Sequence, residues 1–105
     1  MPTPSRRPET LRAFEQQFPR VWAQYRALHE ACDSAGPLPA KTRELIKIGI
    51  EVARKRHGGL VAHTTRARRA GATPTEICQA ILLATPLVGL PDVLDAFTVA
   101  KNHLD

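Results

Sequence analysis

The sequence predicts an all-α protein with about five to six helices, on three observations. Apolar residues recur three and four positions apart through most of the chain, which is the spacing of a helical face. No segment shows the strict alternation of apolar and polar residues that marks a half-buried strand. Clusters of proline and glycine separate the periodic segments, and such clusters break helices.

The first part of the chain contains a short tail and two predicted helices. Residues 1–7, with two prolines and two arginines, are expected to form a flexible tail ahead of a single domain over residues 8–105. Pro8 suits the start of the first helix, and Pro19 ends that helix and opens the second. The apolar faces of these two helices are formed by Leu11, Phe14, Phe18, Val21, Tyr25, Leu28 and Cys32.

A central helix is expected from Pro39 to about Arg56, after the breaker DSAGPLP at residues 33–39. Its apolar positions cover much of the circumference, which places it at the centre of the fold. They are Leu45, Ile46, Ile48, Ile50, Val52 and Ala53. The sequence His57-Gly58-Gly59 is expected to interrupt this helix. A further helix then runs from about Leu60 to Ala70, with Gly71 as its C-terminal cap.

Thr73-Pro74-Thr75-Glu76 is the clearest local signal in the chain, because it combines a capping box with a first-turn proline. The helix that follows has two apolar faces. One face contains Ile77, Ala80, Ile81 and Ala84, and the other contains Cys78, Leu82 and Leu83. Little chain remains to cover both faces, so we expect a homo-oligomer in which another subunit covers one. Pro86 and Gly89 end this helix, and Pro91 begins the last one.

Charge and composition narrow the possible partners. The formal charge is +5, but the fifteen basic residues are spread over all the predicted helices. A dispersed excess is typical of a solvated surface, so nucleic acid is not an expected partner. No apolar run reaches the roughly 20 residues of a membrane span, and the N-terminus lacks the apolar core of a secretory signal. We therefore expect a cytoplasmic protein. Cys32 and Cys78 should be free, half-buried thiols, and the sequence assigns them no role.

Two residues are candidates for acid–base chemistry. His63 follows the spacing of Leu60, Ala67 and Ala70, so its imidazole should face inward, where it could shuttle a proton near neutral pH. The same position also suits a core histidine that bonds a backbone carbonyl. Glu44, at the edge of the central helix's apolar surface, could orient a histidine or act as a base.

Ordinary surface pairing is the alternative for the acidic residues. Glu44 could simply pair with Lys47, and Glu51 with Lys55. The basic run at residues 54–57 would lie at the end of the central helix, where the dipole favours cations. The same run could also receive a carboxylate ligand. No metal is expected, because no two histidines lie three or four apart on one helix and no cysteine joins them. No cofactor is expected either.

Two segments and one histidine resemble the carboxymuconolactone decarboxylase family, which includes the AhpD-type alkylhydroperoxidases. The segments are LPAKTRELI at residues 38–46 and RAGATPTEI at residues 69–77, with His63 between them. The resemblance covers about Phe18 to Ala100. It implies an AhpD-like helical fold whose apolar helices assemble it into a trimer or hexamer.

The peroxidase branch of that family carries a glutamate, a C-x-x-C pair and a histidine four residues after the second cysteine. Glu44 and His63 match the glutamate and the histidine. Arg56 and Gly59 fall on the two cysteine positions, and neither can act as a thiolate nucleophile or a resolving thiol. An alkylhydroperoxidase is therefore the less favoured reading.

The decarboxylase branch does not use the cysteine pair. The resemblance then implies a lyase-type enzyme without redox chemistry that acts on a small acidic metabolite. His63 would give or take the proton, Glu44 would be its partner, and Arg43 or Arg56 would hold the substrate carboxylate. The alternative is a catalytically silent oligomer that binds a ligand or a protein.

Overall fold

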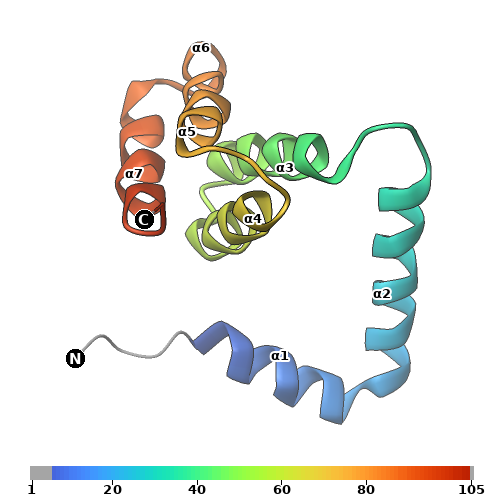
Figure 1. The fold of residues 1–105 in the computed structure, drawn as a ribbon. Helices are drawn as coiled ribbons and strands as arrows, with labels where there is room; N and C mark the ends of the chain where they lie inside the picture. Colours follow the sequence, from blue (N-terminus) through green and yellow to red (C-terminus); the bar gives the residue numbers. More distant parts are fainter. Residues whose placement is uncertain (1–5, 105) are drawn as a thin grey trace. The chain divides into compact units, whose positions relative to one another are not determined.

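The computed structural model describes residues 6–104, and all the regular structure in this range is helical (Figure 1). The longer helices are α1 (Arg6–Gln17), α2 (Pro19–Ser34), α3 (Ala40–Arg54), α4 (His57–Arg69), α5 (Pro74–Leu82) and α7 (Leu90–Lys101). A four-residue helix, α6 (Thr85–Val88), follows α5. The prediction of an all-α fold with five to six helices is confirmed.

The first helix begins earlier than predicted. It starts at Arg6, inside the segment that was expected to be a tail, and residues 1–5 of that expected tail lie outside the described range. Proline is compatible with the first turn of a helix, where its missing N–H has no intrahelical partner. Pro8 therefore does not have to be the first helical residue.

The break between α3 and α4 also differs from the prediction. His57, Gly58 and Gly59 form the first turn of α4, and the break consists of Lys55 and Arg56. Lys55 has a left-handed backbone, with φ of 57°, and its N–H bonds back to the carbonyls of α3. Gly59 is buried, so packing at this turn outweighs the poor intrinsic helix propensity of glycine.

Contacts divide the chain into two units, Met1–Pro37 and Leu38–Asp105. The expectation of one domain over residues 8–105 stays a prediction. In the first unit, α1 and α2 contact each other through aromatic rings. The ring centroids of Phe14 and Phe18 lie 5.3 Å apart, and those of Phe14 and Trp22 lie 6.3 Å apart. None of residues 9–37, the part of this unit whose side chains are described, is buried, so these residues form no core of their own.

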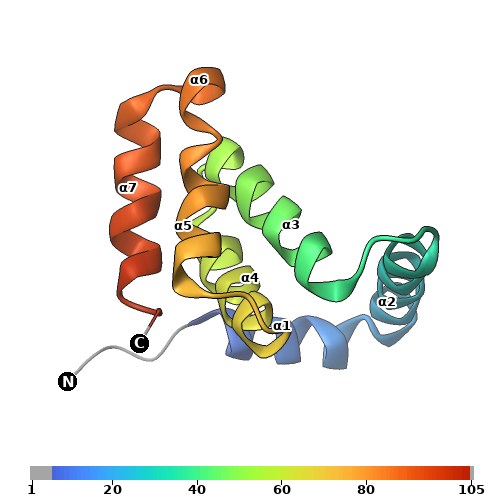
Figure 2. The same ribbon diagram turned by 45° about the horizontal axis from the view of Figure 1, so that its top comes forward.

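The second unit has a continuous apolar core. Figure 2 shows α5 and α7 side by side, and both contact α3 and α4. The core consists of Ile48, Val52, Leu60, Ala67, Ala72, Ile77, Ile81, Ala84, Val93, Ala96 and Ala100. Many of these side chains are alanines, which allow helices to approach closely. The predicted inner face of α5 is confirmed, since Ile77 and Ile81 are almost fully buried.

The connection between α4 and α5 satisfies its backbone locally. Gly71 has φ of 97°, and the N–H of Ala72 donates to the carbonyl of Ala67 over 2.9 Å, as in a Schellman motif. At the start of α5, the backbone N–H of Glu76 donates to Thr73 Oγ1, and the N–H of Thr73 donates to Glu76 Oε1. Both predicted signals, the glycine cap and the capping box, are confirmed.

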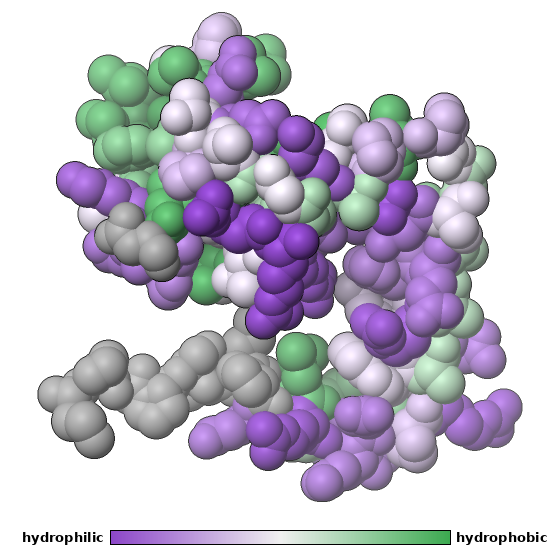
Figure 3. Space-filling view, in the orientation of Figure 1, coloured by the Kyte–Doolittle hydropathy of each residue, from purple (hydrophilic) through white to green (hydrophobic). Residues whose placement is uncertain are grey.

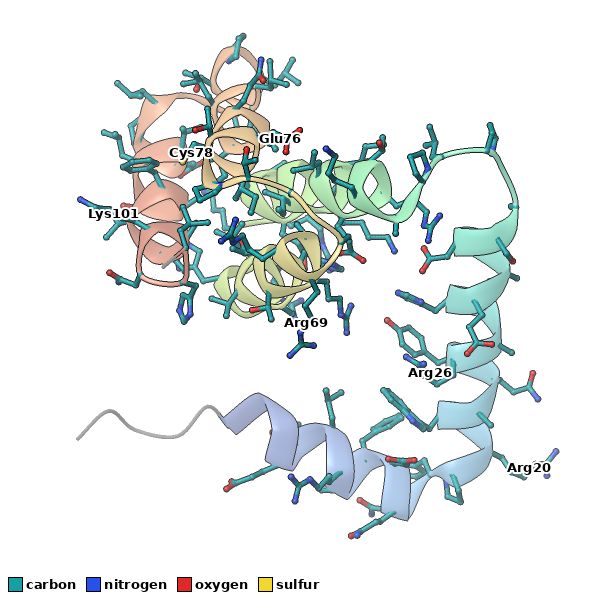
Figure 4. The ribbon with its side chains drawn as sticks, viewed as in Figure 1. Arg20, Arg26, Arg69, Glu76, Cys78 and Lys101 are labelled. Atoms are coloured by element: carbon teal, nitrogen blue, oxygen red, sulfur yellow. The ribbon has the colours of Figure 1, made fainter. Side chains whose placement is uncertain are left out.

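A charged contact joins this capping box to α3. Lys41 Nζ lies 3.0 Å from Glu76 Oε2, and Figure 4 shows Glu76 near the start of α5. The backbone hydrogen bond from Thr73 and the bond from Lys41 both stabilise the carboxylate, so the pKa of Glu76 is lowered. The stability linked to this carboxylate is present above the ordinary glutamate pKa. It is lost as the pH falls through the lowered pKa.

We expect the Glu76→Gln variant to lose less stability than the wild type when the pH falls through that window. Glutamine can still accept the Thr73 N–H, but it does not titrate. Thermal unfolding of both proteins at neutral pH and in acid measures the difference. An equal loss of stability in acid for the two proteins would show that the Glu76 carboxylate does not contribute to acid sensitivity.

The second unit also exposes a large apolar surface, which we call the α5–α7 surface. It consists of Leu82, Leu83, Leu87, Leu90, Leu94 and Phe97, with exposed fractions between 40% and 85%. Figure 3 shows part of it as the green region at the upper left. The predicted second apolar face of α5 therefore has little cover within the described chain. Among the described residues, no helix is long and apolar enough to span a membrane.

Candidate functional site

The structure brings Glu44 and His63 together. Oε2 of Glu44, in the first half of α3, lies 2.6 Å from Nδ1 of His63, in the middle of α4. Both side chains are largely shielded, with exposed fractions of 12% for Glu44 and 15% for His63. A separation this short is typical of a charge-assisted hydrogen bond. Glu44 and His63 therefore form a hydrogen-bonded carboxylate–imidazole pair.

The pairing determines which ring nitrogen of His63 carries the proton. An ionised carboxylate can only accept hydrogen bonds, so Nδ1 of His63 is the donor. In the neutral imidazole, Nε2 then has a lone pair and can accept a proton from a bound molecule. The pair is therefore suited to moving one proton at Nε2.

The imidazole of His63 lies at the edge of the apolar core. Leu60 and Ala67, which flank His63 on α4, are fully buried, and so is Ile48 on α3. Buried core residues therefore lie on both helices that carry the pair. His63 itself retains some exposure, so it is neither enclosed in hydrocarbon nor a fully solvated surface histidine. The predicted inward direction of His63 agrees with this position.

The two arginines expected to bind substrate occupy different settings. Nη1 of Arg43 donates to the carbonyl of Leu38 over 2.6 Å, which links α3 to the residues before it. Arg56 is exposed and lies at the N-terminal boundary of α4. Arg43 belongs to α3, which carries Glu44, and Arg56 directly precedes α4, which carries His63. Their expected role in holding a substrate carboxylate stays a prediction.

The surface pair suggested for Glu51 and Lys55 is replaced by two others. Glu51 Oε1 accepts a hydrogen bond from Arg54 Nη1 over 2.9 Å, and Lys55 Nζ lies 3.6 Å from Asp92 Oδ2 on α7. The suggested Glu51–Lys55 pair is wrong, because the left-handed backbone of Lys55 takes its side chain out of helical register. Arg56 likewise lies between the two helices and His57 begins α4, so neither ends α3.

An apolar groove of about 540 Å³ lies between α3, α5 and α6. Its lining is mainly aliphatic: Leu45, Ile46, Gly49, Ile50, Ala53, Ala80, Leu83, Ala84, Leu87 and Val88, with Thr42, Glu76 and Gln79 as the polar members. Neither Glu44 nor His63 lines it. Successive helical residues are 100° apart, so the α3 residues of the groove centre on the side opposite Glu44. The groove was not predicted, although the second apolar stripe of the central helix was its signal.

The cysteines and the metal-binding potential add little to this site. Cys32 and Cys78 are both free, as expected. Cys78 lies on α5 (Figure 4). Its side chain is half-buried, but Cys32 is exposed, because α2 has no buried residues. Among residues 6–104, no group of three or more histidine, cysteine, aspartate or glutamate side chains is placed to hold a metal ion.

Comparison with known proteins gives one result. Residues 18–102 match the model of the carboxymuconolactone decarboxylase family, a range that contains α2 to α7 and both members of the Glu44–His63 pair. No curated protein and no solved structure gives a significant match to the chain.

Proposed function

Because the chain belongs to the carboxymuconolactone decarboxylase family, we propose that it is a lyase-type enzyme acting on a small acidic metabolite. The observation that carries the proposal is the 2.6 Å contact between Glu44 and His63 at the edge of the core. His63 is the proton donor or acceptor, and Glu44 is its partner. No redox step is involved.

The chemistry requires one proton at one carbon. When the bond to the departing carboxylate breaks, carbon dioxide leaves and its electron pair stays on the substrate as an enolate-like anion. The doubly protonated imidazole gives its Nε2 proton to that carbon, and Glu44 stabilises the imidazolium until the transfer. Arg43 and Arg56 are the proposed ligands of the substrate carboxylate, since guanidinium groups bind carboxylates with two parallel hydrogen bonds. The net charge of +5 favours an acidic substrate.

The first experiment tests the reaction class. The purified protein is incubated with carboxymuconolactone and related lactone acids, and the release of carbon dioxide is followed. Turnover that disappears in the His63→Ala variant, with its oligomeric state unchanged, is the expected result. A His63→Ala variant that keeps its assembly and all measured turnover would remove the enzymatic proposal.

The second candidate function is a catalytically silent oligomer that binds a ligand or a protein. The α5–α7 surface and the apolar groove favour this function, because both consist mainly of apolar side chains, which bind other apolar groups and do not transfer protons. Alkylhydroperoxidase activity is less favoured, because Cys32 and Cys78 lie on separate helices and do not form a C-x-x-C pair. One assay of hydroperoxide consumption with a dithiol donor distinguishes this last reading, and robust consumption would support it.

We also propose that the protein is a cytoplasmic homo-oligomer, a trimer or hexamer, assembled through the α5–α7 surface. Leu87 is 85% exposed, so the Leu87→Lys substitution should leave the fold of the single chain intact. In an interface it would bury an unpaired ammonium, which is strongly unfavourable. We expect the variant to sediment as a smaller species than the wild type.

Sedimentation velocity at equal concentrations measures this change. Asp95→Lys, at an exposed polar position of α7, is the matched control and should not alter assembly. A wild-type protein that is a monodisperse monomer would rule out the proposed oligomer. Dissociation by the control as well would mean that added positive charge, and not the α5–α7 surface, decides the assembly.

A further inference from the structure

Glu51 on α3 lies directly against the backbone of Gly59 on α4. A Cβ placed on Gly59 would be 2.6 Å from Cδ of Glu51 and closer still to Oε2. Real side chains do not approach so closely, so this position accepts no residue with a Cβ unless the Glu51 carboxylate moves. Glu51 is one of the most buried charged residues described, with an exposed fraction of 7%.

The start of α4 explains why a carboxylate is favourable there. No side chain caps this helix, and its first turn contains no acidic residue. Arg56 stands at this end, although the helix dipole disfavours cations there. The Glu51 carboxylate, which also accepts a hydrogen bond from Arg54, supplies negative charge from the neighbouring helix.

Helical geometry connects this contact with the Glu44–His63 pair. Glu44 and Glu51 are seven residues apart on α3, close to two turns, so they share one face. Gly59 and His63 are four residues apart on α4 and also share a face. The late part of α3 thus meets the start of α4, and the early part of α3 meets its middle, as in an antiparallel pair. Two contact points fix both the sliding and the rotation of α4 against α3.

We infer that Glu51 is a positioning residue for the Glu44–His63 pair: its carboxylate, seated on the Cβ-free surface of Gly59, sets the register of α4 that brings Nδ1 of His63 to Glu44. This inference rests on the proposed function in that it concerns the same pair. It assigns Glu51 no contact with substrate. It also explains why position 59 requires glycine: the Glu51 carboxylate occupies the space that a side chain would take.

The test measures the pair directly and requires no substrate. In protein with ¹⁵N-labelled histidine, the ring nitrogen shifts of His63 report which nitrogen is protonated, and its Nδ1 proton should give a resonance far downfield. His63→Gln identifies the signals. The wild type should show the Nδ1-protonated form. A wild type with its proton on Nε2 would remove the Glu44–His63 pair itself, and therefore the proposed function, whatever Glu51 does.

The variants then test Glu51 separately. We expect Gly59→Ala and Glu51→Ala each to lose the downfield resonance and to give a mixture of the two ring forms. Gly49→Ala, a helical glycine whose added Cβ would meet only Ala80 O at 3.8 Å, should retain the wild-type signals. The double variant Glu51→Ala/Gly59→Ala removes the clash and also the carboxylate, so it should still lack the resonance, as Glu51→Ala does. The near-isosteric Glu51→Gln should retain more of it than Glu51→Ala.

Wild-type His63 signals in both Glu51→Ala and Glu51→Gln would overturn the inference, because α4 would then keep its register without the carboxylate. These two variants leave Gly59 intact, so the result does not depend on whether Gly59→Ala folds. A reduced melting temperature with unchanged His63 signals would equally overturn it, since Glu51 would then contribute to stability alone.

Discussion

The His63→Gln variant is expected to turn over substrate about 10² to 10⁴ times more slowly than the wild type, the range that a positioned general acid or base contributes. Glutamine approximates the size of the ring and can still bond Glu44, but it cannot carry a proton to or from a substrate. His63 is only 15% exposed, so a substitution of similar size should preserve the packing of α3 against α4. Initial rates with the lactone acid that gives turnover measure the loss.

The matched control is His103→Gln, the same substitution at an exposed histidine after α7, which should leave the rate unchanged. Glu44→Gln should lower the rate less than His63→Gln, because it removes a partner of the imidazole and not the imidazole itself. Circular dichroism and sedimentation confirm that the variants are folded and assembled. Equal rates for wild type and His63→Gln would leave the silent binding protein as the better account.

The Ile48→Ala variant is expected to lose about 2–5 kcal/mol of unfolding free energy, the usual effect of truncating a large buried aliphatic side chain. Ile48 is fully buried in the core of the second unit, so the truncation removes apolar contacts and leaves a cavity. A domain has only about 5–15 kcal/mol of total stability, so this variant should be close to unfolding at moderate temperature. Chemical denaturation at fixed protein concentration gives the difference.

Ile50→Ala is the control on the same helix. Its side chain is 51% exposed and lines the apolar groove, so the single chain should lose much less stability than with Ile48→Ala. A loss equal to that of Ile48→Ala would mean that Ile50 is buried in the assembled protein, which would locate a subunit contact at the groove. An undiminished stability for Ile48→Ala would contradict the described core.

Most of the helical framework follows from local signals that do not depend on tertiary structure. The capping box at Thr73 and the glycine cap at Gly71 satisfy backbone groups within a few residues, so their sequence patterns predict them directly. The buried face of α5 follows from helical spacing, because Ile77 and Ile81 repeat at the period of the helix. The contact between Glu44 and His63 agrees with the inward position predicted for His63 and with the residues that resemble the family motif.

The features that depend on packing between helices could not be read in this way. Glycines ordinarily end helices, so the sequence suggested a break at Gly58 and Gly59, whereas the buried contact of Glu51 with Gly59 keeps both in α4. The break falls instead at Lys55, whose left-handed backbone no residue preference predicts. The groove was also missed, because its existence depends on the distance between α3 and α5. The spacing of apolar residues along one helix does not predict the distance to another helix.

The exposed α5–α7 surface has a consequence for the stability of the protein. If copies of the chain cover one another there, folding and association are coupled, and mass action makes the folded state more stable as protein is added. The midpoint of thermal unfolding should then rise when the protein is concentrated and fall when it is diluted. The Leu87→Lys chain should show a midpoint that hardly depends on dilution.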